Sequence, residues 1–333
     1  MLVEGLRMST GPDPFAHVPV MRDEIVELFA PVPPGVLLDG TVGGGGHAAA
    51  LLEAHPQLRI VGLDQDPVAV EAASARLAPW GDRATVVRAR FDGFAAVVEE
   101  LGVAGLSGAL LDLGVSSPQL DVAERGFSYR SDAPLDMRMD PDGPVTAADV
   151  VNTWPAADLA RLVAANGEPR FARRITNAIV AARPLATTSQ LADVIRDAIP
   201  APARRTGGHP ARRVFQAIRI AVNDELGVLE PTLEGLIDAL VPGGRVAVLA
   251  YHSGEDRIVK NVLRSAVTGN CTCPPGLPCV CGARPTLRLL GRSARRPGEA
   301  ELAANRRAQS ARLRAGERLP DEPPTDPPSR DPA

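Results

Sequence analysis

The sequence predicts an α/β fold in which a mainly parallel sheet, covered by helices on both faces, carries an inserted small helical domain. Short apolar runs alternate with helical patterns from residue 36 to residue 112, and this spacing is typical of a parallel sheet. The next convincing strand begins only at Arg245. Because ordinary crossovers take a few tens of residues at most, roughly 90 residues of this interval must form an insertion.

Each element of the sheet domain follows from its own pattern. The apolar run over 36–38 is the first strand, and it leads through a glycine cluster into an alanine-rich helix over 48–54. A glycine turn over 242–244 introduces the last predicted strand. The remaining elements are a strand over 59–64, a helix over 67–77, a strand over 84–89, a helix over 94–101, and strands over 108–112 and 245–251.

The inserted segment has helical periodicity with proline and glycine between the helices, which are predicted over 156–165, 170–182 and 189–199. A further helix over 212–225 is expected to return to the sheet domain and to place Phe215, Ile218 and Val222 in its core. Ligands of open α/β sheets bind at the carboxyl ends of the strands, so a domain inserted there can recognise a substrate. The expected domains are a flexible N-terminus over 1–16, a sheet domain formed by 17–121 and 211–318, a helical domain over 122–210 and a disordered tail over 319–333.

Composition favours a cytoplasmic protein that binds a polyanion at chosen faces. The chain has 333 residues, 45% of them hydrophobic, and a net charge of -4. It contains no apolar run of about 18 residues, so no membrane partner is expected. Arginines gather over 204–219 and 284–318, which suggests a polyanionic partner for an otherwise acidic chain. Solvated helix faces with scattered salt bridges are the alternative explanation.

All four cysteines fall in one short C-x-C-x5-C-x-C stretch, formed by Cys271, Cys273, Cys279 and Cys281. Disulfides are rare in the cytoplasm, so the spacing raises a structural zinc site with thiolate ligands. C-x-C pairs are poorer zinc ligands than C-x2-C pairs, however, and the neighbouring prolines also fit a rigid loop. No metal is assigned from the sequence, and both interpretations stay open.

The glycine cluster over 43–46 predicts a site for an adenosine-like ligand, because glycines let the backbone approach a nucleotide closely. Asp64 ends the second strand, where a carboxylate accepts hydrogen bonds from the ribose of NAD or of S-adenosylmethionine. Asp64 could instead cap the next helix, but Asp66 is better placed for that role. Phe91, after the third strand, fits either an adenine contact or the core.

The fourth strand ends in Asp112, and an oxygen-bearing turn with Ser116 and Ser117 follows it. Methylation of an exocyclic ring amine needs acceptors for the amine protons, so that the nitrogen lone pair can attack a sulfonium methyl group in line. A dehydrogenase would need a proton-transfer residue near a carbonyl, and no comparably placed histidine is found. An NAD-dependent oxidoreductase remains an alternative, because Gly43, Gly45 and Ala48 satisfy the dinucleotide pattern.

Sixteen blocks of the sequence, among them LDLGVSSPQLD over 111–121 and PLDMRM over 134–139, make the chain similar to the bacterial 16S ribosomal RNA cytosine-N4 methyltransferase family known as RsmH or MraW. The blocks lie in family order between about residues 17 and 318. They cover 39–41, 44–47, 111–121, 125–128, 134–139, 167–168, 171–172, 209–212, 215–220, 222–223, 225–226, 252–253, 255–260, 305–306, 310–311 and 313–314.

The resemblance implies a Rossmann-like class I methyltransferase sheet that uses S-adenosylmethionine. The implied reaction is methylation of the N4 amine of a specific cytidine in the decoding centre (P site) of 16S rRNA, in the assembled 30S subunit. The implied partner is therefore this rRNA, and no DNA is expected. A methyltransferase for another amine and a non-catalytic assembly factor are the alternatives. The implied cofactor contacts are Gly44, Gly45, Gly46, His47, Asp64, Phe91, Asp112 and Gln119.

The expected catalytic residues are Asp112, Ser116, Ser117 and His252. His252 follows the fifth strand together with Ser253, Glu255 and Asp256, and we expect this group to shape the target-base pocket. The alternative is a helix N-cap by Ser253 with two acidic residues in the first turn. The expected RNA contacts are Arg212, Arg213, Arg219, Arg306 and Arg307. Departures from the family pattern, such as Arg213 and Gly254, remove none of the cofactor contacts.

Overall fold

The structure is a computed structural model that describes residues 18–204, 209–274 and 280–320. The expected flexible N-terminus over 1–16 and nearly all of the expected tail lie outside these ranges. The chain divides into two compact units, a sheet unit formed by Val20–Gly114 and Leu226–Ala333 and a helical unit that includes Val115–Glu225. Within the described ranges, no helix combines the length and the apolar character that crossing a membrane requires.

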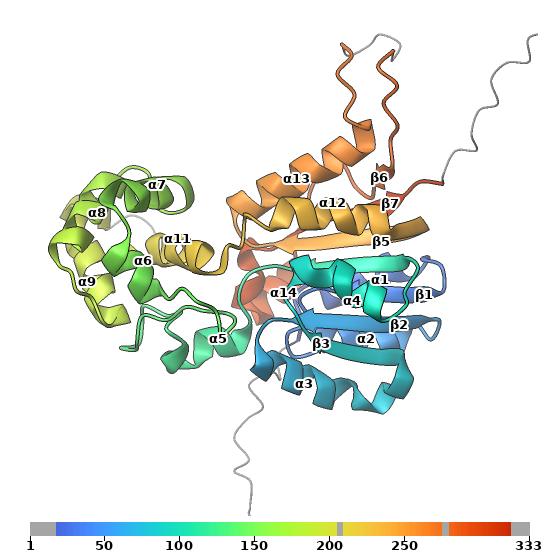
Figure 1. The fold of residues 1–333 in the computed structure, drawn as a ribbon, viewed down its shortest axis with the longest axis horizontal. Coiled ribbons are helices and arrows are strands. Elements are labelled where there is room, and N and C mark those ends of the chain that lie inside the picture. Colours follow the sequence, from blue (N-terminus) through green and yellow to red (C-terminus); the bar gives the residue numbers. More distant parts are fainter. Residues whose placement is uncertain (1–17, 205–208, 275–279, 321–333) are drawn as a thin grey trace, which may run out of the picture. The chain divides into compact units, whose positions relative to one another are not determined.

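The sheet unit is built on seven strands in the order β3-β2-β1-β4-β5-β7-β6 (Figure 1). Strands β1 to β5 are parallel, β7 pairs antiparallel with β5, and β6 pairs antiparallel with β7. The order reverses between β1 and β4, so the carboxyl ends of these two strands flank the position where such sheets bind ligands. The strands are β1 (Gly35–Asp39), β2 (Leu58–Asp64), β3 (Ala84–Arg88), β4 (Leu106–Asp112), β5 (Leu240–Ala250), β6 (Leu287–Leu289) and β7 (Arg312–Arg318).

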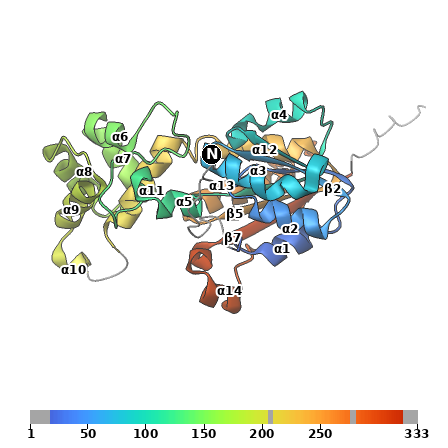
Figure 2. The same ribbon diagram turned by 90° about the horizontal axis from the view of Figure 1, so that it is seen from below.

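Both faces of the sheet are buried, because alternate residues of the central strands enter two different cores. In β1, Leu37 belongs to one apolar cluster and Leu38 to the other. Figure 2 shows α1 and α2 on one side of the sheet and α4 on the other. The first face is covered by α1 (Arg22–Phe29), α2 (Gly46–Ala54) and α3 (Pro67–Leu77), and the second by α4 (Phe94–Glu100), α12 (Leu229–Ala239) and α13 (Ser253–Thr268).

The predicted strands and helices of this unit are confirmed, with small shifts at their ends. The helix over 67–77 has the predicted bounds, because Asp66 caps it and Pro67 occupies its first turn. The last predicted strand is longer than expected, since Leu240 pairs with Leu106 beyond an irregularity in the register. Strands β6 and β7 lie in the arginine-rich segment, where no strand was predicted. The unit also contains α14 (Glu299–Ala304) and the 3-10 turns Ala78–Arg83, Phe91–Gly93 and Arg306–Ser310.

The helical unit packs around its own core, in which the buried stripes of its longer helices meet. The three helices predicted in the insertion are confirmed as α7, α8 and α9. Asn223 ties a loop to this core, since its side chain donates to Met137 O and accepts from Met139 N. The helices are α5 (Ser117–Asp121), α6 (Ala147–Thr153), α7 (Ala156–Asn166), α8 (Ala172–Ala181), α9 (Thr188–Ala198), α10 (Ala201–Arg204) and α11 (Ala211–Asn223), with a 3-10 turn at Ala123–Arg125.

The boundaries of the helical unit differ from the expected 122–210. Helix α11 was expected to return to the sheet domain, but Val214, Phe215 and Ile218 are buried in the helical core, where α11 packs against α6, α7 and α9. The physical reason is that the apolar stripe of α11 completes this core. The unit also begins earlier than expected, at Val115, and so includes α5.

Candidate functional site

The glycine turn after β1 is the first part of the candidate site. Gly43 and Gly45 have positive φ values of 50° and 75°, which residues other than glycine rarely adopt. A Cβ on Gly45 would also stand 3.3 Å from the Cα of Ala73 in α3. The N-cap of α2 is Gly45, which has no side chain to cap the helix, so the N–H groups in the first turn of α2 are suited to a ligand.

Asp64 lies at the end of β2, and its side chain is hydrogen-bonded to the backbone of the glycine turn. Its Oδ2 accepts from the N–H of Gly43 at 3.0 Å, and its Oδ1 accepts from the N–H of Asp66 at 2.9 Å. Burial raises the pKa of Asp64 to about 6. Asp66, and not Asp64, caps α3 by accepting from the N–H of Val68 at 3.1 Å. Each carboxylate oxygen of Asp64 retains acceptor capacity for a further hydrogen bond.

Asp39, at the end of β1, joins Asp64 and Asp112 in a group of carboxylates at neighbouring strand ends. Only 1% of Asp39 is exposed. The pKa of Asp39 is raised to about 7, mainly by burial. His47 and the N–H of Thr41 oppose this rise, and the charges of Asp112 and Asp64 contribute to it. The group makes this end of the sheet electronegative, which favours a positively charged ligand.

Asp112, at the end of β4, is held from two sides. Its backbone N–H donates to Thr41 Oγ1 at 2.6 Å, and its Oδ1 accepts from the hydroxyl of Tyr251 at 2.7 Å. Burial and the charge of Asp112 keep the pKa of Tyr251 well above its usual value, so the hydroxyl stays a donor. Tyr251 directly follows β5, the strand beside β4.

His47 lies in the first turn of α2, with its Nε2 3.6 Å from Asp112 Oδ2. The residue is 6% exposed, yet neither ring nitrogen has a hydrogen-bond partner among the described residues. Leaving such groups unpaired is costly in a buried place. Two unpartnered nitrogens beside a carboxylate therefore indicate a polar ligand at this position.

The residues present fit S-adenosylmethionine, which combines an adenosine with a positively charged sulfur and an amino-acid end. The glycine turn offers backbone N–H groups, Asp64 offers acceptors, and the carboxylate group offers negative charge for the sulfonium. Phe91 is half-buried in the 3-10 turn after β3, and its Cβ would stand 3.2 Å from a Cβ placed on Gly40. That position puts Phe91 at the end of β1, and its contact with adenine stays a prediction.

His252 forms the N-cap of α13 and thereby has a structural role. Its Nδ1 accepts from the N–H groups of Gly254 and Glu255 at 3.1 and 3.3 Å. Its Nε2 lies 3.1 Å from Glu255 Oε1 but makes no well-aligned hydrogen bond with any described residue. The alternative interpretation of this segment, a helix N-cap, is therefore confirmed, but the capping residue is His252 and not Ser253. Whether His252 also contacts the target base stays a prediction.

The two acidic residues of this first turn are also engaged. Glu255 is 2% exposed, and its Oε2 accepts from the N–H groups of Tyr251 and His252. Asp256 forms ion pairs with Arg312 and Arg314 of β7 at 2.8 and 2.7 Å. These contacts fix α13 to the sheet and hold Tyr251 in place, so the structure gives both acids a structural role where a pocket-shaping role was expected.

Ser116, Ser117 and Gln119 belong to the helical unit. Gln119 is buried, and its Oε1 accepts from the N–H of Ser116 at 3.0 Å, which closes the start of α5. The side chain of Ser117 lies outside what the structure describes. These three residues and Asp112 thus belong to different units, and the roles of the three residues stay predictions.

The expected RNA contacts differ in their exposure. Arg212 and Arg213 are exposed on α11, and Arg213 forms an ion pair with Glu168 at 3.2 Å. Arg219 instead forms a bidentate ion pair with Glu225, and the side chain of Arg219 is only 15% exposed. Arg219 thus stabilises the end of α11, and it does not have the accessibility expected of a phosphate contact. Arg307 is half-buried in a 3-10 turn, and the side chain of Arg306 lies outside the described part.

Sequence reasoning did not assign a role to Asp39, Thr41 or Tyr251. Asp39 and Thr41 stand in the first motif block, and Tyr251 ends the last predicted strand. A signal was present for Tyr251, since the fourth and fifth strands of such sheets are neighbours. Of the cysteines, Cys271, Cys273 and Cys281 share one loop of the sheet unit, and Cys279 lies outside the described residues.

Comparison with known proteins places this arrangement in a family. A ribosomal RNA small subunit methyltransferase H from Heliobacterium modesticaldum is 52% identical over 311 residues, which cover 92% of this chain and 99% of that protein. The protein of the same name from Thermobifida fusca is 56% identical over 310 residues, 91% of this chain and 93% of that protein.

Among solved structures, an rRNA methylase from Streptococcus thermophilus has a TM-score of 0.38 at 12% identity, and the match covers 90% of this chain and 94% of that one. The family model described as the MraW methylase family matches residues 14–319. The chain, from its glycine turn to its last strand, belongs to the MraW methylase family.

Proposed function

We propose that this protein transfers a methyl group from S-adenosylmethionine to the N4 amine of a specific cytidine in the decoding centre of 16S rRNA, in the assembled 30S subunit. Membership of a methylase family supports the reaction type. The relatives named ribosomal RNA small subunit methyltransferase H support the RNA substrate. The observation that carries the proposal is the placement of Asp112, His47 and Tyr251 beside the glycine turn at the carboxyl ends of β1 and β4.

The cofactor would be held by residues of the sheet unit. The glycine turn over 43–46 receives the nucleoside, Asp64 accepts from the ribose hydroxyls, and Phe91 packs beside the adenine. The carboxylate group of Asp39, Asp64 and Asp112 faces the positive end of the molecule. When bound, S-adenosylmethionine supplies an electrophilic methyl group on a charged sulfur.

Asp112 is the proposed catalytic residue. The N4 amine of cytosine has two protons and a lone pair that is delocalised into the ring. A carboxylate that accepts one N–H favours the pyramidal nitrogen, and it is also placed to take the proton that the nitrogen loses when it gains the methyl group. Tyr251 donates to Oδ1, so it orients the carboxylate and leaves Oδ2 to face His47. Ser116, Ser117 and His252 remain proposed contacts of the target base.

RNA binding would use arginines from both units. Arg212 and Arg213 are exposed on α11 and can contact phosphates, and Arg306 and Arg307 offer a second contact. A cytidine in folded RNA must leave its stack before it can react, which costs a few kcal/mol. Phosphate contacts over a wide surface offset this cost. DNA is not proposed as a substrate.

The test uses the purified chain, isotopically labelled S-adenosylmethionine and small subunits from a strain that lacks this methylation. We expect one labelled product, N4-methylcytidine, at a single decoding-centre position after nuclease digestion and mass spectrometry. An Asp112→Asn variant should bind the cofactor but transfer little label. Label on another base, or on DNA in a parallel incubation, would contradict the substrate assignment. Labelling of free 16S rRNA equal to that of small subunits would contradict the requirement for an assembled particle.

A further inference from the structure

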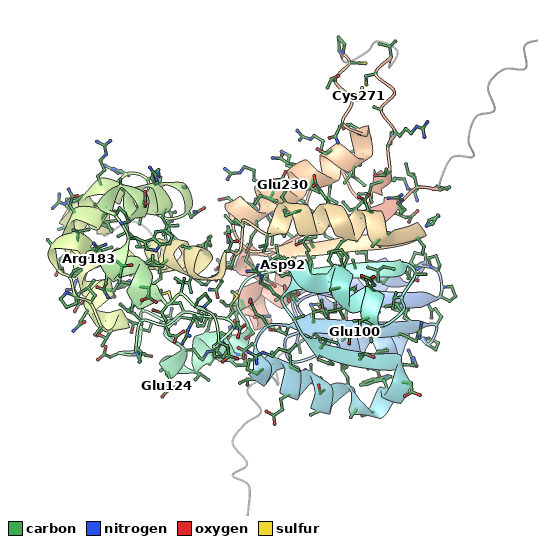
Figure 3. The ribbon with its side chains drawn as sticks, viewed as in Figure 1. Asp92, Glu100, Glu124, Arg183, Glu230 and Cys271 are labelled. Atoms are coloured by element: carbon green, nitrogen blue, oxygen red, sulfur yellow. The ribbon has the colours of Figure 1, made fainter. Side chains whose placement is uncertain are left out.

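The loop between α13 and β6 has a closed base. Gly269, just after α13, has a φ of 59°, and a Cβ there would stand 2.4 to 2.5 Å from backbone atoms of Arg284 on the returning limb. The N–H of Thr286 donates to Ala266 O at 2.9 Å. The two limbs of the loop therefore start side by side, and Figure 3 shows Cys271 on the outgoing limb beyond the end of α13.

Three thiols from the two limbs meet in this loop. The Sγ atoms of Cys271, Cys273 and Cys281 all lie within 4.8 Å of one another, and those of Cys271 and Cys281 are 3.6 Å apart. A disulfide bond requires about 2.05 Å, so this pair is not bonded. Tetrahedral zinc with bonds of about 2.3 Å to sulfur places its ligand sulfurs about 3.8 Å apart. The 3.6 Å between Cys271 and Cys281 is close to the separation of two sulfurs on one metal ion, and the sulfur of Cys273 lies within 4.8 Å of both.

Backbone and solvent reach these sulfurs. The backbone N–H of Val280 donates to Cys273 Sγ at 3.4 Å, so a residue of the returning limb contacts a sulfur of the outgoing limb. Cysteine is usually among the most buried residues, yet Cys271 and Cys273 are half-exposed and Cys281 is exposed. Apolar burial therefore does not explain why the three thiols converge.

The described residues 271–274 and 280–286 include no helix or strand, and the side chain of Val280 is 88% exposed. Long loops without structure of their own are uncommon in compact domains and commonly have a function. A metal ion bound by both limbs would cross-link them beyond the closed base.

We propose that Cys271, Cys273 and Cys281 bind one Zn²⁺ ion that joins the two limbs of this loop. Soft thiolate ligands select zinc over magnesium or calcium, and zinc needs no redox partner. Cys279 lies outside the described residues, and the proposal rests on the other three thiols. The site is separate from the carboxylate group at the strand ends, and methyl transfer does not depend on it.

The test measures metal in the full chain, produced and purified without chelators. We expect about one zinc ion per chain by mass spectrometry of the metal content. Cys271→Ser, Cys273→Ser and Cys281→Ser should each lose most of the zinc, whereas the control Thr272→Ser in the same loop should retain it. Circular dichroism should show that all four variants are folded, because the loop lies outside the apolar clusters of the sheet unit.

Cobalt substitution gives a second measurement that does not depend on variants. Replacing zinc with Co²⁺ should produce thiolate-to-cobalt charge-transfer bands and the visible bands of tetrahedral coordination, and these should weaken in Cys281→Ser but not in Thr272→Ser. A chain without bound metal whose thiols all react freely would overturn the proposal. So would bound iron with inorganic sulfide, or zinc that all three serine variants retain.

Discussion

Asp39 is a buried carboxylate whose ionisation opposes folding. Its pKa of about 7 in the folded chain lies above the ordinary value of 3.8. Between these values the folded chain holds a proton that the unfolded chain has released. The contribution of Asp39 to stability is therefore complete below about pH 4 and is lost as the pH rises through about 7. A bound cation would compensate for the charge that burial disfavours.

Replacing Asp39 with Asn should raise the stability of the free protein relative to wild type at pH 8, and the gain should shrink as the pH falls toward about 4. The reason is that Asn resembles the protonated acid, and below about pH 4 the wild type holds this proton in both the folded and the unfolded chain. Thermal unfolding of both proteins across this pH range checks the expectation. The control is Asp82→Asn at an exposed position. A difference between Asp39→Asn and wild type that stays constant with pH would show that Asp39 does not titrate in this range.

Tyr251 is expected to act as a positioning residue through Asp112. Tyr251→Phe removes one hydrogen bond to the carboxylate, worth about 1 kcal/mol, so kcat should fall about fivefold. The affinity for S-adenosylhomocysteine, measured by calorimetry, should change less than twofold. In an Asp112→Asn background the same substitution should have little further effect, because the two residues act together. Equal losses in both backgrounds would remove Tyr251 from this role.

At the scale of elements, the turn between β1 and α2 is the most constrained part of the site. Gly45 combines a φ of 75° with close contact to α3. Gly45→Ala should lower the free energy of unfolding by roughly 1–2 kcal/mol through backbone strain, and crowding against Ala73 should add to this loss. Affinity for the cofactor should fall as well, because the turn must shift. Denaturant unfolding and calorimetry measure the two effects.

Gly298 provides the matched control for this turn. It has a φ of -71°, and a Cβ there would meet no atom within 4 Å, so Gly298→Ala should leave both stability and affinity nearly unchanged. If Gly45→Ala behaved like Gly298→Ala, the turn would be more tolerant than its backbone angles indicate.

The strands and helices around this turn could be predicted because their signals are local. Glycine after an apolar run and Asp-Pro at a helix start fix the bounds of β1 and α3 within a few residues. Strand β7 could not be predicted in the same way. In β7, arginines interrupt the apolar pattern that would mark a strand. These arginines are neutralised by partners far away in the sequence, such as Asp256 for Arg312 and Arg314. His252 was likewise found to cap α13, a backbone role that composition does not reveal.

At the scale of the whole molecule, the sequence predicted an insertion after β4 but not its two boundaries. Spacing between strands measures only the length of an insertion. The unit to which α11 belongs depends on the core that its apolar stripe enters. Val214 and Phe215 enter the core of the helical unit. Arg219 shows the same limit for site residues. Arg219 lies in a basic segment of the sequence, yet the turn at the end of α11 brings Glu225 into an ion pair with it.

The exposed arginines of α11 lead to a prediction for the intact protein. The double substitution Arg212→Gln with Arg213→Gln should weaken binding to small subunits and reduce the salt slope by about one for each phosphate group that the variant no longer neutralises. Affinity for S-adenosylhomocysteine should not change. Arg161→Gln, an exposed arginine on α7 paired with Asp158, is the control. Filter binding at several salt concentrations checks both variants, and an unaltered slope in the double variant would exclude these arginines from the RNA interface.

The central claim is that the methyl donor binds at the carboxyl ends of β1, β2 and β4. The most direct measurement is a crystal structure of the chain with S-adenosylhomocysteine. We predict density over the glycine turn, with the ribose hydroxyls in hydrogen-bond distance of Asp64 and the amino-acid end beside Asp112 and His47. Density for the ligand at any other place in the chain, with this group of residues unchanged, would contradict the account.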